Sequence, residues 1–470
     1  MLMVHPTDSV IAAVDAGHRA ARADLDALSR IPSIAFEGFD PAPVRESAEA
    51  TAALMQRSGL RGVRLLELPD AGDDAPPAVY AERTDAGPGA PTVLLYAHHD
   101  VQPTGPVEQW SSPPFEPTER DGRLFGRGCA DDKAGVVAHA AAVAAWVELA
   151  GAPPVNVKVI IEGEEELGSP HLDAFLAEHG DLLAADAVVV ADLVNWQVGV
   201  PSLTYLLRGM IDVTVEVAVL DHAVHSGMYG GPVPDPLTAL AKLIGDLTDD
   251  RGAVVLPALR AGLRSPTAAE QQRLATLDFD EDRFRGEASL GAGVPLGGDP
   301  DLPALQRIWM EPNLTVLGID APAVRQATNA IQPTARAKLG LRIGPGQDAR
   351  TVRQALVDHL QSQSPMGLSV RAVPGAAGDP FEADVDQPAV GVMLEALAEG
   401  YGAAPVLMGC GGSIPLLDPL QRANPQATML LMGVEDPDSR AHGIDESLHL
   451  DDWRSACRSV ALLLGKLGQR

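Results

Sequence analysis

Residues 91–100, PTVLLYAHHD, form an apolar run that ends in two histidines and an aspartate. Further on, residues 155–163, VNVKVIIEG, and residues 186–192, DAVVVAD, have the same character. Between these runs lie two expected helices, the Ala-rich stretch 134–150 and the shorter stretch 169–180. Alternating strands and helices predict an α/β domain with a mainly parallel central sheet, and such sheets carry their sites at the carboxyl ends of the strands.

Polar side chains stand at or just past the ends of these strands. His98, Glu165 and Asp192 are distant in the sequence, and Glu165 belongs to EGEEELGS, residues 162–169. Carboxylates crowded at the end of a buried strand repel one another and lose solvation, so a cation is expected to offset them. Each residue alone has an ordinary explanation as a surface histidine, an N-cap or a charged turn. Their recurrence at successive strand ends predicts a metal site.

The pattern changes after residue 208. In MIDVTVEVAVL, residues 210–220, apolar and polar residues alternate, which predicts a strand with one buried face. An irregular Gly- and Pro-rich stretch is expected at about 251–310. The other expected segments, in the order helix, strand, strand, helix, strand, are residues 235–247, 314–320, 335–343, 349–361 and 368–373. This βαββαβ order predicts a ferredoxin-like domain over 209–375, inserted into a discontinuous domain of residues 1–208 and 376–470.

Composition narrows the function classes. The 470 residues include 64 acidic and 35 basic ones, for a net charge of −29, and such a surface repels nucleic acid and anionic membranes. Cys129, Cys410 and Cys457 have no CxxC spacing, which argues against a disulfide framework and fits a reducing cytoplasm. The sequence has no signal-peptide pattern and no apolar run of about 18 residues, so we expect a cytoplasmic protein.

Seven motifs resemble the signatures of one known family. In chain order they are HHDVQP (98–103), GRGCADDKAG (126–135), EGEEELGS (162–169), ADLVNWQVGVPSLTYLLRG (191–209), HSGMYGG (225–231), GGSIP (411–415) and AHGIDE (441–446). They are similar to those of the M20 dinuclear metallopeptidases, and most similar to the carnosine-dipeptidase-like branch. The resemblance implies a zinc-peptidase-like catalytic domain and an inserted lid that commonly mediates homodimer formation.

The resemblance also implies a site for two divalent metal ions. His98 and Asp192 would bind one ion, Glu166 and His442 the other, and Asp131 would bridge the two. Zn²⁺ is the expected ion, and Mn²⁺ or Co²⁺ would also accept this mixture of nitrogen and oxygen ligands.

The remaining acids have other implied roles. Asp100 would orient the imidazole of His98, and Glu165 would be the general base. Glu162 and Glu164 would lie outside the ligand set. The expected chemistry is attack of a metal-activated hydroxide on a peptide carbonyl, with Glu165 passing the proton to the leaving amine.

Substrate contacts are expected from other motifs. The resemblance implies that His225 stabilises the oxyanion, often across a dimer interface, and that Arg342 pairs with a substrate carboxylate. It places Asn329 at a substrate-contacting position, and the Gly-rich turn with Gly412 and Ser413 could hold a free carboxylate. His225 could instead be a strand-corner residue and Arg342 a solvated one.

Three departures from the family pattern stand out. Cys410 precedes GGSIP where the family often has an acidic residue, which bears on recognition of the substrate carboxylate. Cys129 replaces a small residue in GRGCADDK, and Gly340 stands where serine is common. Packing is the simplest account of Cys129.

These features predict a metallopeptidase that cleaves dipeptides or short peptides with a free C-terminal carboxylate. Hydrolysis of N-acyl amino acids by a deacylase or desuccinylase is the alternative, since it needs the same hydroxide. A non-catalytic metal- or peptide-binding protein is a second alternative, although Glu165 and Asp100 are both present. The sequence contains no GxSxG elbow of a serine hydrolase and no GxGxxG in GRGCADDKAG for a dinucleotide.

Overall fold

A computed structural model of the chain describes residues 6–68, 75–414 and 417–469. The described residues form two compact units. Those of the first unit lie within Met1–Tyr205, Ala383–Met408 and Ile414–Arg470, and those of the second are Leu206–Glu382 and Gly409–Ser413. Gly409–Ser413 thus groups with the second unit, whereas the sequence boundaries placed it in the catalytic domain. Two side chains of the second unit contact this segment, because Arg208 Nε donates to the carbonyl of Gly411 at 3.3 Å and Arg342 Nη1 donates to Ser413 Oγ at 3.1 Å.

The first unit is built on a sheet with the strand order β1-β2-β6-β3-β7-β17-β8. Its central strands β6, β3, β7 and β17 are parallel, and β2 and β8 flank them in antiparallel orientation. The expectation of a mainly parallel central sheet is therefore confirmed. The strands are β1 (Arg61–Leu66), β2 (Ala78–Arg83), β3 (Thr92–His98), β6 (Asn156–Glu162), β7 (Ala187–Val194), β8 (Ser202–Leu207), β16 (Val406–Cys410), which pairs with β8, and β17 (Thr428–Glu435), with a small sheet of β4 (Thr118–Arg120), β5 (Arg123–Phe125) and β18 (Ser447–His449).

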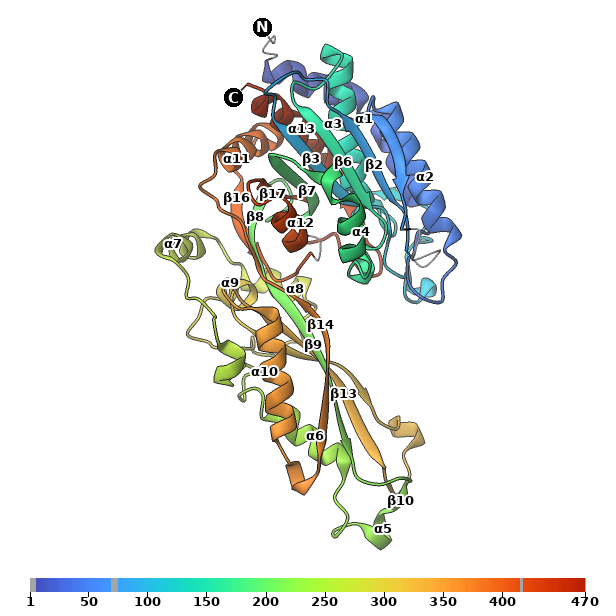
Figure 1. Cartoon of the computed structure of the whole chain (residues 1–470), viewed down its shortest axis with the longest axis vertical. Coiled ribbons are helices and arrows are strands. Elements are labelled where there is room, and N and C mark those ends of the chain that lie inside the picture. The colour runs from blue at the N-terminus through green and yellow to red at the C-terminus, as the bar shows by residue number, and fades with distance from the viewer. Residues whose placement is uncertain (1–5, 69–74, 415–416, 470) are drawn as a thin grey trace. The chain divides into compact units, whose positions relative to one another are not determined.

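Helices cover both faces of this sheet (Figure 1). On one face α1, α3 and α13 pack against one another, and α4 and α12 lie on the other. The helices of this unit are α1 (Thr7–Ser29), α2 (Ala42–Arg57), α3 (Lys133–Ala150), α4 (Leu172–His179), α11 (Pro388–Tyr401), α12 (Leu417–Ala423) and α13 (Leu450–Leu467). Among the described helices, only α3 has the length and apolar composition to cross a membrane, but 67% of it is buried inside the protein, as in a core helix.

Local sequence explains the bounds of α3. The carboxylate of Asp132 caps its first turn by accepting from Gly135 N at 3.1 Å. Gly151 ends the helix in the left-handed conformation, with φ of 81°, and its N–H donates to Val147 O. The loop that precedes Asp132 is therefore held at a defined place beside the sheet.

Parallel pairing brings the predicted strand ends together. His98 lies beside Glu162 in the β3–β6 register, and Tyr96 lies beside Val190 in the β3–β7 register. Asp192 follows Val190 by two residues and lies within β7. The carboxyl ends of β6, β3 and β7 consequently meet at one edge of the sheet.

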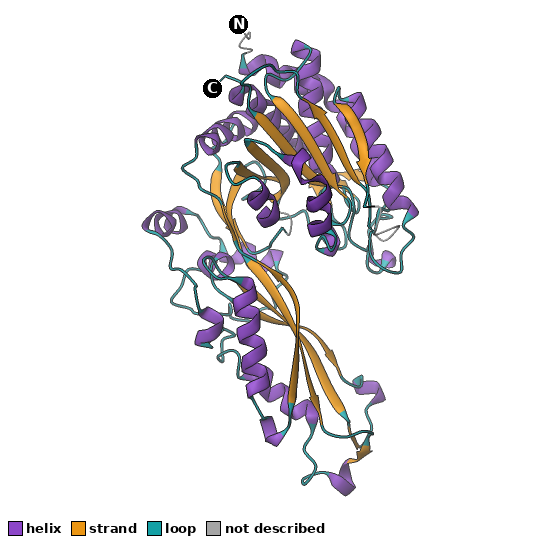
Figure 2. Ribbon diagram, viewed as in Figure 1, coloured by secondary structure: helices purple, strands orange, loops and turns teal. Residues whose placement is uncertain are grey.

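The second unit has the predicted βαββαβ order and is ferredoxin-like. Its elements are β9 (Gly209–Ala218), α6 (Pro236–Gly245), β11 (Asn313–Asp320), β13 (Thr334–Ile343), α10 (Ala349–Ser362) and β14 (Val370–Gly378). The sheet order is β11-β13-β9-β14 with antiparallel neighbours, and α6 and α10 pack against it (Figure 2). Ile211, Val213, Val215 and Val217 are buried, as their alternation predicts. Two short paired strands, β10 (Val224–His225) and β12 (Ala330–Ile331), complete this part.

The stretch 251–310 is not irregular throughout, which corrects the sequence prediction. It contains α7 (Ala268–Thr276), α8 (Glu281–Glu287) and α9 (Ala304–Trp309). Thr267 and Glu270 form a capping box at the start of α7, and Glu270 also pairs with Arg264 at 2.8 Å. Caps and one ion pair define a helix too short to be recognised from hydrophobic periodicity.

Candidate metal centre

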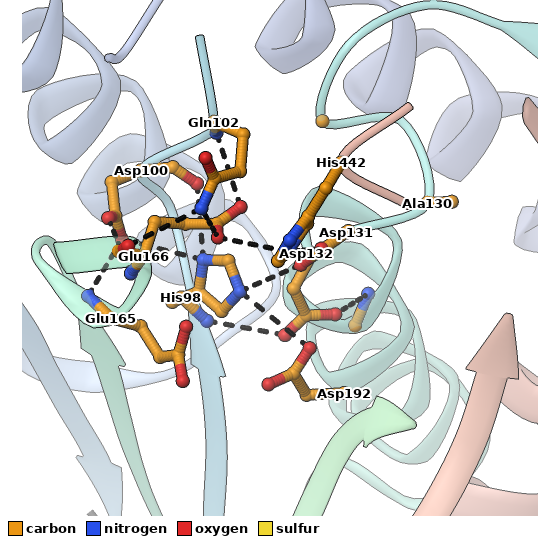
Figure 3. A network of polar contacts seen from close by, with 12 residues as sticks. His98, Asp100, Gln102, Ala130, Asp131, Asp132, Glu165, Glu166, Asp192 and His442 are labelled. Atoms are coloured by element: carbon orange, nitrogen blue, oxygen red, sulfur yellow. Dashed lines mark hydrogen bonds and ion pairs between the residues drawn. The ribbon is translucent and has the colours of Figure 1, made fainter. Parts of the chain in front are cut away.

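His98 stands among carboxylates at the carboxyl edge of the first unit's sheet (Figure 3). Its Nε2 lies 3.0 Å from Asp131 Oδ1 and 3.7 Å from Asp192 Oδ1. Its Nδ1 lies 3.1 Å from the backbone oxygen of Asp100. Three segments that are far apart in the sequence therefore converge on one buried imidazole.

A second histidine faces the other oxygen of Asp131. His442 Nε2 lies 3.0 Å from Asp131 Oδ2 and 3.1 Å from Glu166 Oε2. Asp131 thus presents one carboxylate oxygen to His98 and the other to His442. A carboxylate placed in this way has the arrangement of a ligand shared by two metal ions.

The donor atoms fit metal ions. Two groups, His98–Asp131–Glu166 and His98–Asp132–Asp192, each place their ligand atoms within 4.8 Å of one another. Asp132 belongs to the second of these groups, and its carboxylate also accepts from His98 N at 3.2 Å and from Gly135 N at 3.1 Å. Imidazole nitrogen and carboxylate oxygen are ligands for Zn²⁺, and Mn²⁺ and Co²⁺ accept them too.

Electrostatic interactions at this edge favour a bound cation. Burial alone would lower the pKa of His98, but the charge of Asp192 and hydrogen bonds with Asp100 and Asp131 raise it well above its ordinary value. Hydrogen bonds, first with Asp131 and then with Glu166, raise the pKa of His442 to about 11. Burial raises the pKa of Asp192 to about 6. Burial thus disfavours the charged form of Asp192 unless nearby positive charge offsets it, and divalent cations supply such charge more strongly than protons.

Asp100 connects this edge to EGEEELGS. Its Oδ1 accepts from Glu165 N at 3.2 Å, and its Oδ2 accepts from Glu166 N at 3.1 Å. Gln102, to which the sequence assigned no role, donates from Nε2 to Glu166 Oε2 at 2.7 Å. Burial raises the pKa of Glu165 well above its ordinary value. The backbone of the Glu165–Glu166 pair is therefore fixed, and the Glu165 carboxyl has an elevated proton affinity.

The other two acids of EGEEELGS have partners of their own. Glu162 Oε2 accepts from the hydroxyl of Tyr96 at 2.8 Å. Glu164 accepts from His171 N at 3.0 Å, and its Oε2 lies 2.8 Å from His171 Nδ1. The crowding of carboxylates is thus relieved in part without any metal ion.

Sequence reasoning missed a buried ion pair that ties the site loops together. The carboxylate of Glu446 lies 2.5 Å from Arg127 Nη1 and accepts from the amides of Gly128, Ala130 and Asp131 at 3.1–3.2 Å. Both side chains are buried. Arg127 Nη2 also donates to the carbonyls of Gly443 and Pro103, at 3.0 and 3.2 Å. Arg127 lies in the motif GRGCADDKAG and Glu446 in AHGIDE, so their place in these motifs is the sequence feature that could have indicated a role.

Replacing Glu446 with alanine is expected to weaken metal binding about 10–100-fold. The amide of Asp131 loses its acceptor, and Arg127 is left buried without its carboxylate. Titration against a competing chelator measures the affinity, with thermal unfolding run alongside. Glu446→Gln is expected to have a smaller effect, and Glu395→Ala, at an exposed position of α11, none. An unchanged metal affinity in a folded Glu446→Ala protein would contradict the positioning role.

The predicted substrate residues form two separate pairs in the second unit. His225 on β10 lies opposite Ala330, and Ser226 N donates to Asn329 O at 2.9 Å, so His225 and Asn329 are neighbours. Both are exposed. Arg342 Nη1 donates to Ser413 Oγ at 3.1 Å.

These two pairs lie at opposite ends of β13. Arg342 is next to the last residue of that strand, and Thr334, its first residue, follows β12 closely. Eight residues of extended chain span about 26 Å. In one chain, His225 and Asn329 are therefore far from Arg342. Beside Arg342, the amide of Gly412 lies 3.4 Å from Cys410 Sγ.

Histidines and carboxylates at the edge of a mainly parallel sheet, in a chain that also has an inserted ferredoxin-like unit, fit the class of metal-dependent hydrolases. The family model described as Peptidase family M20/M25/M40 matches residues 94–466. A cysteinylglycine-S-conjugate dipeptidase from Corynebacterium striatum is 36% identical over 361 residues, which cover 76% of this chain and 77% of the relative. The chain belongs to this peptidase family, as the motifs predict.

Other relatives extend the likeness. A Beta-Ala-His dipeptidase from Mus musculus is 29% identical over 364 residues, covering 76% of this chain and 73% of the relative. Among solved structures, the dipeptidase Dug1p from Saccharomyces cerevisiae matches with a TM-score of 0.85 at 23% identity. The match covers 100% of this chain and 100% of Dug1p. This structural likeness confirms the fold.

Proposed function

We propose that this protein is a dinuclear metallopeptidase that cleaves dipeptides or short peptides with a free C-terminal carboxylate. The observation that carries the proposal is the placement of Asp131, which turns one oxygen to His98 and the other to His442. The family membership and the relatives named as dipeptidases support the same reaction.

In this proposal Asp131 would be a ligand shared by two metal ions. His98 and Asp192 would complete one set of ligands, and Glu166 and His442 would complete the other. When bound, two divalent cations, Zn²⁺ first and Mn²⁺ or Co²⁺ as alternatives, supply Lewis acidity and lower the pKa of water.

Glu165 then acts as the general base. Its carboxylate takes a proton from the attacking water and hands it to the leaving amine, a task for which a raised pKa is suited. Asp100 holds the Glu165 backbone and contacts His98, with 3.4 Å between Asp100 Oδ1 and His98 Nδ1. Base and ligand are thereby positioned by one side chain.

Metal analysis combined with a substrate panel tests this function. The purified protein is expected to bind about two metal ions per chain and to cleave dipeptides until a chelator is added. Cleavage of N-acetyl amino acids alone would favour the deacylase alternative. Absence of hydrolysis after reloading with Zn²⁺, Mn²⁺ and Co²⁺ would favour a non-catalytic binding protein.

We further propose a homodimer formed through the second unit. β11 is an edge strand that pairs only with β13 among the described strands, and Val316, Leu317 and Ile319 on it are 39–56% exposed. Exposed apolar edge strands are templates for pairing with another chain. The separation of about 26 Å along β13 supports a role for His225, and with it Asn329, in the partner's site, because one dipeptide does not span it.

A cytoplasmic location is part of the same proposal. Among the described residues the three cysteines form no disulfide, and Cys129 and Cys457 are buried. Reduced thiols are typical of proteins in a reducing compartment.

Replacing His225 with alanine is expected to lower kcat about 10²-fold, as loss of an oxyanion donor does. If His225 serves the partner's site, mixing His225→Ala with Glu165→Gln protein restores activity, because each mixed dimer has one intact site. Random mixing is expected to recover about a quarter of the wild-type rate. Failure to recover activity, with mixed dimers verified by two affinity tags, would place His225 outside the partner's site.

A further inference from the structure

Two arginines of the second unit form no ion pair with any described carboxylate. Among the described residues, Arg208 donates only to backbone carbonyls, to Gly411 O at 3.3 Å and Glu311 O at 3.2 Å. Arg342 donates to the hydroxyl of Ser413. Such uncompensated cations are unexpected in a chain with 64 acidic and 35 basic residues. Glu311 accepts from Arg208 through its backbone oxygen, but its carboxylate forms an ion pair with Arg260, at 2.7 Å.

Both guanidinium groups lie against the short segment Gly409–Ser413. Arg208 contacts Gly411, and Arg342 contacts Ser413 two residues later. Both side chains are partly buried. Burial, and then the positive charge of Arg342, lower the pKa of Arg208 to about 10. Two cations that are partly desolvated and repel each other favour binding of an anion between them.

The local sequence leaves this positive charge in place. Cys410 carries a thiol just before GGSIP, where the family often has an acidic residue. The backbone carbonyls that hold Arg208 orient its planar group without neutralising it, and its Nη2 makes no hydrogen bond with the described residues. A guanidinium with free N–H groups is suited to bidentate binding of a carboxylate.

We infer that Arg208 and Arg342 together bind a substrate that carries two carboxylates, so that the preferred C-terminal residue is glutamate or aspartate. Arg342 and Ser413 take the terminal carboxylate, and Arg208 takes the carboxylate of the side chain. The inference rests on the proposed function and adds Arg208 as a specificity-determining residue.

Matched dipeptides test this assignment. For the wild-type enzyme, kcat/KM for Ala-Glu is expected to exceed that for the isosteric Ala-Gln at least about tenfold, because Ala-Gln leaves a guanidinium without its anion. In Arg208→Met this ratio is expected to fall to about one, and in Arg208→Lys to an intermediate value. Arg350→Met, an exposed position of α10 with the same change of charge, serves as the control and keeps the wild-type ratio. A wild-type ratio near one overturns the inference.

Ligand binding separates failure of this inference from failure of the proposed function. Calorimetric titration of wild-type and Arg208→Met protein with glutamate and glutamine requires no turnover. Tighter binding of glutamate that depends on Arg208, in a protein that cleaves no dipeptide, supports the site and rejects the peptidase. Cleavage of Ala-Ala without any preference for Ala-Glu rejects the site and supports the peptidase. If Arg208→Met does not fold, the inference is tested by the ratio of kcat/KM for Ala-Glu to that for Ala-Gln in the wild-type enzyme and in Arg208→Lys.

Discussion

Replacing Glu165 with glutamine is expected to lower kcat about 10²–10⁴-fold, the contribution of a positioned general base. Glutamine keeps the shape of the side chain, and the backbone N–H of residue 165 can still donate to Asp100. The amide does not accept the proton of the attacking water. Metal content and thermal stability are expected to stay at wild-type values. Steady-state kinetics on one dipeptide, together with metal analysis of the same sample, measure both quantities.

Glu164→Gln is the matched control for this experiment. It makes the same chemical change one residue away, at a carboxylate that contacts His171. Its kcat is expected to remain within about tenfold of wild type, since it removes no proton acceptor from the proposed mechanism. Equal losses in the two variants would show that charge in EGEEELGS matters without identifying Glu165 as the base.

Removal of metal by chelation is expected to lower the rate on the order of 10³-fold or more. Metal ions contribute several kcal/mol of transition-state stabilisation, and each 1.4 kcal/mol or so is worth a factor of about ten. The melting temperature is expected to fall as well, because a cation that binds the folded state stabilises it. Rates and unfolding curves before and after dialysis, and after separate addition of Zn²⁺, Mn²⁺ and Co²⁺, measure the loss and the recovery.

Asp131→Asn tests the shared ligand within that experiment. Asparagine preserves the size of the side chain but removes the charge that contacts both His98 and His442. The number of metal ions per chain is expected to fall below two. Asp173→Asn, an exposed position of α4, provides the control with the same substitution. Two tightly held ions in Asp131→Asn would reject a bridging role.

Much of this protein is determined by local sequence. Apolar runs predicted β3, β6 and β7, because a buried strand needs apolar side chains whatever its neighbours are. Strict alternation predicted β9 and its buried face. The motifs in order predicted the family, and they brought His98, Asp131 and His442 into one hypothesis before their positions were known.

The contacts between distant segments were decided only by the tertiary structure. Arg127 and Glu446 are 319 residues apart, and no periodicity relates them. The grouping of Gly409–Ser413 with Arg208 and Arg342 is of the same kind. Periodicity and caps act over a few residues, so they determine which segments become strands and helices. Which oxygen of Asp131 faces which histidine depends on how those elements pack, because charge and hydrogen bonding act between residues that are close in space.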